Sequence, residues 1–354
     1  MVETNTTNTT NTTNTTNTTN TTNTTNTTSI EFAHSGQTSS IPLSHALQGT
    51  VDAISKSYAP SVSVGDLAPP PIPDRGYRSL NARHRMQLLV DALTTDLEVV
   101  VDATSTNQVT KVNLLDNATP QISLVLDRSP AALGNWNNQL TKLDTRQQHR
   151  HNRINEIILQ QTDILSFLSL PLRFGPVTHP WTTVMITAIH AAIVKMEIPV
   201  KEHFSMPRPV EIDPGIQPII QTPAHSSFPS GHATEAFGLA RVLGLRFLKS
   251  NEQDKSLRKI ASRISENRSY AGVHFLADNL AGGHLGNVLA QIFANRLGLA
   301  NSPIVATTIN PLSVTAIEDT AVLVDGTTNI RAANATATGD ILKWIKKMSD
   351  EEMI

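Results

Sequence analysis

The chain has 354 residues, no cysteine and a formal net charge of −2. Without cysteine it has no disulfide framework, no cysteine-ligated metal and no thiol nucleophile. The near-neutral charge excludes a general basic surface for nucleic acid, so any anion site must be local.

The N-terminal part of the chain does not have the composition of a packed core. Residues 1–28 are dominated by an Asn-Thr-Thr repeat without apolar side chains to offset the entropy of ordering, and we predict disorder there. Prolines are frequent in residues 29–80, which predicts an extended lead-in. No basic region followed by an apolar run opens the chain, and no apolar run approaches the ~20 residues of a membrane span. We therefore expect a soluble protein, cytoplasmic by default.

Residues 81–300 have helical periodicity and form the predicted core domain. Val109 to Leu126 fits either short strands or a loop. We expect residues 301–354 to pack on the core or to mediate assembly, with a short amphipathic piece from Ile341 to Met348. Because most periodic stretches are helical, the predicted fold is an all-α helical bundle. Its predicted helices cover residues 81–101, 138–170, 180–199, 236–248 and 280–297.

Around Ser230 a loop runs into a helix. The loop is rich in small residues and proline, and the helix that follows is apolar. Ser230 suits the N-cap, and Gly231 lets an oxyanion approach the free amides of the first turn. His232 follows as a candidate proton donor. The alternative interpretation is an ordinary capped helix with a surface histidine.

Two other segments carry unusual polar residues. Lys201 and Arg208 lie seven positions apart, and a proline follows the arginine. Farther along, Arg268 precedes His274 and Asp278, which are four residues apart and would share a helix face. Singly, these are ordinary surface charges or a satisfied interior histidine. Together, cations, a hydroxyl, a helix start and two histidines suit a tetrahedral oxyanion that passes through a trigonal-bipyramidal state.

The three motifs Lys-x6-Arg-Pro, Pro-Ser-Gly-His and Arg-x5-His-x3-Asp occur in this order. The pattern resembles the superfamily shared by vanadium-dependent haloperoxidases and type 2 phosphatidic acid phosphatases, and most closely the soluble bacterial haloperoxidases. The resemblance implies the helical bundle of that family. It covers roughly Lys201 to Gly286, and Asn267 departs from it where the family usually has serine.

The resemblance also implies a role for each motif residue. His274 would be the axial residue, either ligating vanadium or forming phosphohistidine, and His232 would be the acid-base residue across the site. Asp278 would orient His274 or an arginine. The equatorial oxygens of vanadate or phosphate would be held by Lys201, Arg208, Ser230, Gly231 and Arg268.

Three features favour a haloperoxidase. His225 stands five residues before Ser230, where bromide-oxidising relatives of this type carry histidine; the alternative is a solvent-facing loop histidine. The segments Gly-Val-His-Phe and Asp-Asn-Leu-Ala-Gly resemble soluble bacterial haloperoxidases, and no membrane span is expected. The predicted activity is the vanadate-dependent oxidation of bromide or iodide by hydrogen peroxide to hypohalous acid, which halogenates a small organic acceptor. The resemblance further implies at least a dimer.

Two alternatives stay open. A soluble acid phosphatase would use the same residues, with His274 attacking phosphorus and His232 protonating the leaving alcohol. A degenerate member would only bind an anion or serve as a structural module, although every catalytic position is filled.

Overall fold

The computed structural model describes residues 73–172, 174–247, 251–312, 320, 323–324 and 336–353. The predicted disordered repeat and residues 29–72 of the lead-in lie outside this range. The last part of the lead-in differs from the prediction, because helix α4 (Pro73–Ser79) replaces extended chain. The described residues up to Arg85 belong to one unit and those from Met86 onward to a second. In the first unit the Arg85 side chain donates hydrogen bonds to the carbonyls of Tyr77, Arg78 and Leu80.

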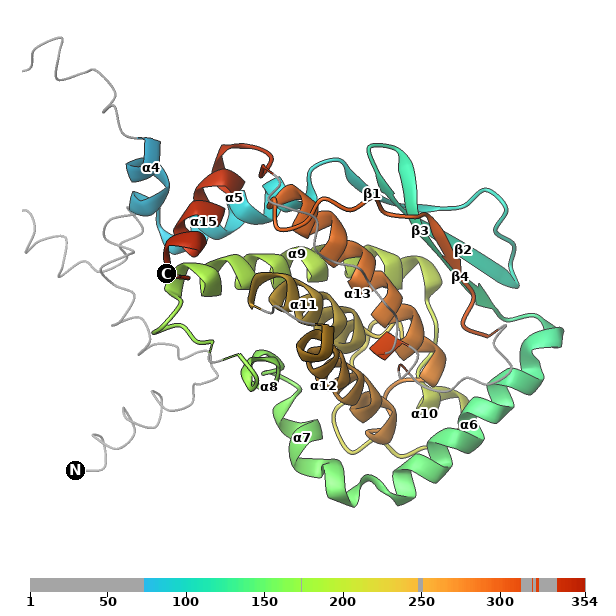
Figure 1. Cartoon of the computed structure of the whole chain (residues 1–354). Coiled ribbons are helices and arrows are strands. Elements are labelled where there is room, and N and C mark those ends of the chain that lie inside the picture. Colours follow the sequence, from blue (N-terminus) through green and yellow to red (C-terminus); the bar gives the residue numbers. More distant parts are fainter. Residues whose placement is uncertain are drawn as a thin grey trace, which may run out of the picture. The chain divides into compact units, whose positions relative to one another are not determined.

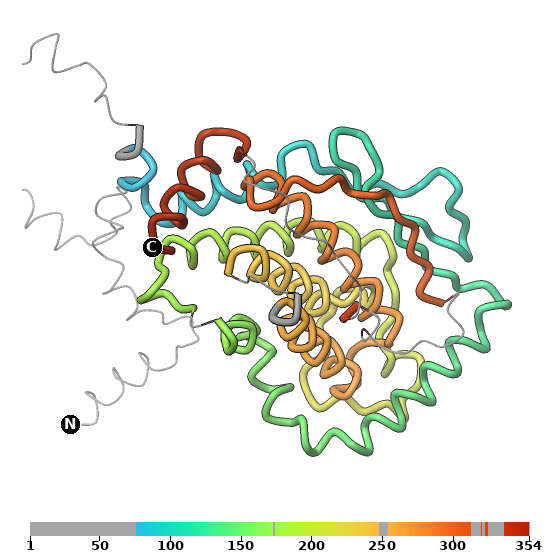
Figure 2. The backbone as a smooth tube through the Cα atoms, in the orientation of Figure 1, coloured from blue at the N-terminus to red at the C-terminus, as the bar shows by residue number. Residues whose placement is uncertain are grey.

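Helix α11 is central to the second unit, because it contacts α9, α12 and α13. In both ribbon and tube views these helices lie side by side (Figures 1 and 2). The described α-helices after α4 are α5 (Ala82–Thr94), α6 (Leu133–Gln148), α7 (Ile154–Leu159), α8 (Leu165–Ser169), α9 (Pro180–Phe204), α10 (Pro209–Ile212), α11 (Gly231–Phe247), α12 (Asn251–Tyr270), α13 (Leu276–Arg296) and α15 (Asp340–Glu351).

The all-α prediction is wrong in one respect, since a small mixed sheet accompanies the helices. Strands β1 (Leu97–Val101), β2 (Val109–Asp116) and β3 (Thr119–Asp127) pair antiparallel, and β4 (Thr307–Ile309) pairs parallel with β3. Strands β2 and β3 bury aliphatic side chains such as Leu114 and Leu124, and the sheet contacts α9 and α13. Branched and other apolar residues in these strands gain burial against the two helices, which resolves the ambiguity of Val109 to Leu126 in favour of strands.

Several predicted helix bounds differ from the structure. The single helix expected over residues 138–170 is divided into α6, α7 and α8, and α11 and α13 begin several residues earlier than predicted. The helix expected over residues 81–101 ends at Thr94, and Asp96 has a φ of 58°, which breaks the helix before β1. Conversely, α9 continues past Pro199 to Phe204. Proline costs a helix one hydrogen bond, but Val200 and Phe204 are fully buried beyond it, and this packing sustains the last turn. That turn carries Lys201.

Helices α11 and α13 pack with their backbones in close approach. A Cβ atom on Gly282 would lie 2.4 Å from the carbonyl oxygen of Ser230, and one on Gly286 would lie 2.1 Å from that of Thr234. Only glycine permits this separation. One turn earlier the backbone N–H of Ser230 donates to the carbonyl of Asp278 at 2.9 Å. The close packing therefore joins the second and third motifs.

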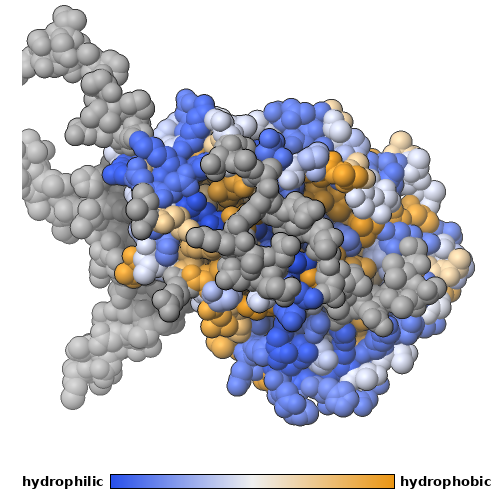
Figure 3. Space-filling model, viewed as in Figure 1, coloured by the Kyte–Doolittle hydropathy of each residue, from blue (hydrophilic) through white to orange (hydrophobic). Residues whose placement is uncertain are grey.

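The buried stripe of α12 explains why Arg268 points inward. Leu257, Ala261 and Ile264 follow a helical period and are completely buried, and Arg268 continues the same face. The opposite face carries exposed charges such as Arg263. Polar side chains accordingly gather over α12 and α6 in the lower part of Figure 3.

The C-terminal segment contacts the core through α15. Trp344 packs edge-on against Trp181 of α9 with ring centroids 5.3 Å apart, and the hydroxyls of Thr182 and Ser349 lie 2.7 Å apart. Among the described residues, one helical stretch, Pro180–Ile212, has the length and apolarity of a membrane span, and half of that window is buried within the protein. The soluble state expected from the sequence stays a prediction.

Candidate active site

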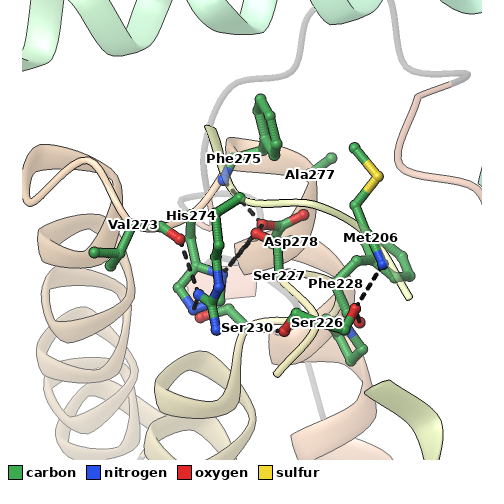
Figure 4. A network of polar contacts seen from close by, with 12 residues as sticks. Met206, Ser226, Ser227, Phe228, Ser230, Val273, His274, Phe275, Ala277 and Asp278 are labelled. Atoms are coloured by element: carbon green, nitrogen blue, oxygen red, sulfur yellow. Dashed lines mark hydrogen bonds and ion pairs between the residues drawn. The ribbon is translucent and has the colours of Figure 1, made fainter. Parts of the chain in front are cut away.

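The predicted site residues come from five elements that meet at one place. Lys201 lies in the last turn of α9 and Arg208 directly before α10, while His232 is in the first turn of α11 and Arg268 in the last turn of α12. His274 and Asp278 flank the start of α13. Figure 4 shows the loop from Ser226 to Ser230 lying against His274 and Asp278.

His274 is buried and held in one orientation. Arg208 Nη1 lies 3.0 Å from its Nε2, and because a guanidinium only donates, Nε2 is the acceptor. The ring proton is therefore on Nδ1, which lies 3.1 Å from Asp278 Oδ2. Burial and the positive charges of Arg208 and Lys201 hold the pKa of His274 well below its usual value. His274 is thus a neutral imidazole with its lone pair directed at a cation.

Lys201 and Arg208 are almost completely buried, at 1% and 2% exposure. Lys201 Nζ donates to the carbonyls of Pro229 and, at 3.4 Å, Ser226. Arg208 donates to the carbonyl of Val273 at 2.9 Å and to that of His225 at 3.0 Å. Burial is the main cause that lowers the pKa of Lys201, to about 8. Among the described residues these two buried cations are hydrogen-bonded only to neutral partners, and they create a positive local field.

Several buried polar atoms at the site have no hydrogen-bond partner among the described residues. One is an acceptor, Asp278 Oδ1, and three are donors, namely Ser230 Oγ and the Nε and Nη1 atoms of Arg268. Arg268 uses only Nη2, which donates to the carbonyl of Ile157 at 3.1 Å. A buried donor without an acceptor is costly, so the three donors fit an oxyanion that would accept their hydrogen bonds.

His232 lies on the Arg268 side of the site. Its Nε2 is 2.9 Å from the carbonyl oxygen of Gln160, so Nε2 carries the proton of the neutral ring. Gln160 Oε1 in turn lies 3.5 Å from Arg268 Nη2. Burial and the charge of Arg268 lower the pKa of His232 to about 4.

His225 lies at the surface beside Arg208. Its Nδ1 accepts from Arg208 Nη2 at 3.2 Å, and it is exposed on a cavity that Lys201 also lines. The structure therefore brings His225 next to the other predicted residues, in contact with the arginine of the first motif.

Residues 180–299 match the PAP2 superfamily. This segment is a PAP2 superfamily domain. It contains all nine predicted site residues, from Lys201 to Asp278. No curated protein matches the chain. A solved structure described as the first transmembrane PAP2 type phosphatidylglycerolphosphate phosphatase, from Bacillus subtilis, is 16% identical, covering 62% of this chain and 88% of that chain with a TM-score of 0.27.

The PAP2 domain also contains polar residues that the sequence analysis missed. Ser227 Oγ donates to Asp278 Oδ2, and the backbone N–H of Phe275 donates to the same oxygen at 2.9 Å. Asp278 thus receives three hydrogen bonds, although burial raises its pKa to about 6. In the sequence, the only feature that marks Ser227 is that it follows Ser226 in the loop before the Pro-Ser-Gly-His motif.

Glu197 is a second missed residue, one turn before Lys201 on the buried face of α9. It is 3% exposed, its Oε2 has no hydrogen-bond partner within the described part of the chain, and its Oε1 would lie 2.7 Å from a Cβ on Gly231. Burial and then Glu235 raise its pKa to about 8. A glutamate four residues before a lysine within an apolar helix was a usable signal for it.

The departure at Asn267 has a structural role. The residue is completely buried, and its Nδ2 donates to Glu156 at 3.0 Å and to Gln160 Oε1 at 2.9 Å. Its Oδ1 accepts from Arg153 at 2.9 Å. Asn267 therefore links α12 to Gln160, whose backbone carbonyl accepts the hydrogen bond from His232.

Proposed function

We propose that the PAP2 domain hydrolyses phosphate monoesters, with His274 as the nucleophile. The observation that carries this proposal is the state of His274, which is buried and neutral with Nδ1–H on Asp278 and its Nε2 lone pair beside Arg208. Such a nitrogen is an oriented nucleophile next to a group that attracts the phosphoryl oxygens.

The reaction needs two steps that the site residues can perform. His274 Nε2 attacks phosphorus, the ester P–O bond breaks, and His232 gives a proton to the departing alkoxide. Water then attacks the phosphohistidine as His232 takes its proton, and this releases inorganic phosphate and restores His274. Because Nε2 of His232 is bonded to Gln160, Nδ1 is the nitrogen that exchanges this proton.

The remaining residues stabilise the transferred group. Arg208, Arg268 and Lys201 would donate to its equatorial oxygens, with Ser230 and the amide of Gly231. A bound dianion offsets the charge of Arg268 and Lys201, which raises the pKa of His232 and allows it to hold the proton.

The structure adds an observation that favours an ester substrate. His232 lines a cavity that also includes Gln160, His190 and Glu235. A leaving group protonated by His232 has space there. The sequence motifs favoured a haloperoxidase, but because of this cavity we place the phosphatase first.

A vanadium haloperoxidase is the second candidate, because His225 contacts Arg208 at the edge of the site. The unpartnered donors of Ser230 and Arg268 fit vanadate as well as phosphate, and His274 Nε2 would be the protein ligand. When bound, vanadate would supply a Lewis acid that activates hydrogen peroxide. His225 would then accept or return protons near the halide.

One pair of assays separates the candidates. Purified full-length protein is assayed for p-nitrophenyl phosphate hydrolysis, with and without orthovanadate, and for bromide- and iodide-dependent halogenation of a phenol indicator with hydrogen peroxide. Hydrolysis that orthovanadate inhibits supports the phosphatase. Halogenation that requires orthovanadate, without hydrolysis, overturns it in favour of the haloperoxidase. Inactivity in both assays with retained phosphate binding indicates an anion-binding module.

A further inference from the structure

Two cavities that share no lining residue border the candidate site. The first is lined by Lys201, Glu202 and His225 among others, and His225 contacts Arg208, which contacts His274. The first cavity is therefore on the side of the nucleophile. The second, here called the His232 cavity, is lined by residues that include Gln160, Asp163, His190, His232, Glu235 and Leu239.

In-line displacement assigns the leaving group to one of these cavities. The departing oxygen lies opposite the attacking nitrogen of His274, and His232 must be within reach of it to donate a proton. Since His232 lines only the second of the two cavities, the alcohol of the ester occupies the His232 cavity.

The charged groups of the His232 cavity are mostly acidic. Asp163 is exposed and accepts the Ser166 amide at 2.9 Å, and its pKa is lowered by the hydrogen bonds from Ser166. Glu235 Oε2 lies 2.7 Å from His190 Nε2. No described residue lining the cavity is lysine or arginine. His190 pairs with Glu235, and His232 carries the proton that it donates to the leaving group. Asp163 has no ion-pair partner among the described residues, so its carboxylate is available to a cation of the ligand.

The size of the cavity limits the leaving group. Its volume is about 160 Å³, below the roughly 300–1,000 Å³ of pockets for drug-sized ligands. Its walls also include apolar side chains of Ile164, Ile186 and Leu239, which suit a short carbon stem.

We infer that the His232 cavity selects phosphate esters of short alcohols that carry a cation, such as amino alcohols, and disfavours anionic leaving groups. This inference rests on the proposed phosphatase function. The ester phosphate would occupy the cationic site, the short stem would lie against Ile186 and Leu239, and the ammonium would face Asp163 and Glu235.

Three substrates of similar length test the charge preference. They are O-phosphoethanolamine, ethyl phosphate and phosphoglycolate, which end in an ammonium, a methyl group and a carboxylate. We expect kcat/KM to fall in that order for the full-length protein. An enzyme carboxylate about 7 Å from a unit charge on the substrate, in a water-like medium, should change kcat/KM roughly threefold.

Asp163→Asn locates the effect. Asparagine keeps an oxygen for the Ser166 amide, so folding is retained. We expect the variant to lower kcat/KM for phosphoethanolamine and raise it for phosphoglycolate, each about threefold, and to leave ethyl phosphate unchanged. Glu202→Gln, which removes an exposed carboxylate from the first cavity, is the control and should change none of these ratios.

The outcomes distinguish this inference from the proposed function. If none of the three esters nor p-nitrophenyl phosphate is hydrolysed, the phosphatase proposal fails and the inference falls with it. If the esters are hydrolysed with equal kcat/KM, or phosphoglycolate is preferred, only the inference is overturned. Equal responses of Asp163→Asn and Glu202→Gln would also overturn it.

Discussion

Asp278 Oδ2 lies 3.1 Å from Nδ1 of His274 and 2.9 Å from the backbone nitrogen of Phe275. His274 stands two residues before the start of α13. One carboxylate oxygen therefore caps the helix and fixes the imidazole. The helix start and the orientation of the proposed nucleophile depend on the same atom, so a change to Asp278 affects both.

Asp278→Asn should lower kcat for p-nitrophenyl phosphate by about 10- to 100-fold, the range found for residues that orient metal-ligating histidines. The neutral amide no longer favours the tautomer with the proton on Nδ1. Steady-state kinetics measure the change, and thermal unfolding separates it from loss of the helix cap. An unchanged kcat in a folded variant would contradict the orienting role.

His274→Ala should abolish both hydrolysis and any vanadate-dependent halogenation, because either reaction needs Nε2 of this residue. His151→Ala, at an exposed histidine in another part of the fold, should leave activity unchanged. Quenching the wild type in alkaline denaturant with labelled substrate should trap an acid-labile, base-stable phosphohistidine that His274→Ala lacks. Turnover by a folded His274→Ala protein would show that another residue is the nucleophile.

His225→Ala discriminates between the two candidate functions. The carbonyl of His225 still accepts from Arg208 at 3.0 Å after the ring is removed, so hydrolysis should change by less than about threefold (under 1 kcal/mol). Bromide oxidation, if present, should be lost with the imidazole. Parallel phosphatase and haloperoxidase assays of this variant measure both, and a large loss of hydrolysis would place His225 in the phosphoryl site.

The three motifs predicted the cationic and histidine residues of the site because each is a local pattern with an unusual composition. Their partners were harder to predict, since they act through tertiary contacts. Gln160 holds His232 through a backbone carbonyl 72 positions away, and no local pattern marks such a bond. Ser227 acts in the same way on Asp278.

The fold was predictable where apolar residues recur at helical spacing, as in α9 and α11. Leu97 and Val100 were assigned to a helix because their spacing fits that period by coincidence, whereas the left-handed conformation of Asp96 starts a strand there. The expected oligomer, the bound vanadate and the soluble state stay predictions.

Gly286→Ala should destabilise the protein by separating α11 from α13. Its Cβ would lie 2.1 Å from the carbonyl oxygen of Thr234, and overpacking of this kind typically costs about 1–3 kcal/mol. Gly134→Ala is the matched control, since no atom lies within 4 Å of its Cβ. Thermal unfolding should show a lower Tm for Gly286→Ala only, together with weaker phosphate binding because Ser230 moves relative to Asp278. Equal Tm values for the two variants would refute the close-packing argument.

Glu197→Gln should become more stable relative to the wild type as pH rises from 5 to 8. Burial and Glu235 raise the pKa of Glu197 from 4.5 to about 8, so over this range the folded wild type keeps a proton that the unfolded chain releases. The contribution of protonated Glu197 to the free energy of unfolding is complete below pH 4.5 and is lost as pH approaches 8. Glutamine does not titrate, so the Tm difference, variant minus wild type, should grow with pH in differential scanning fluorimetry. Glu202→Gln should show no such trend, and a constant difference for Glu197→Gln would mean that Glu197 is ionised throughout.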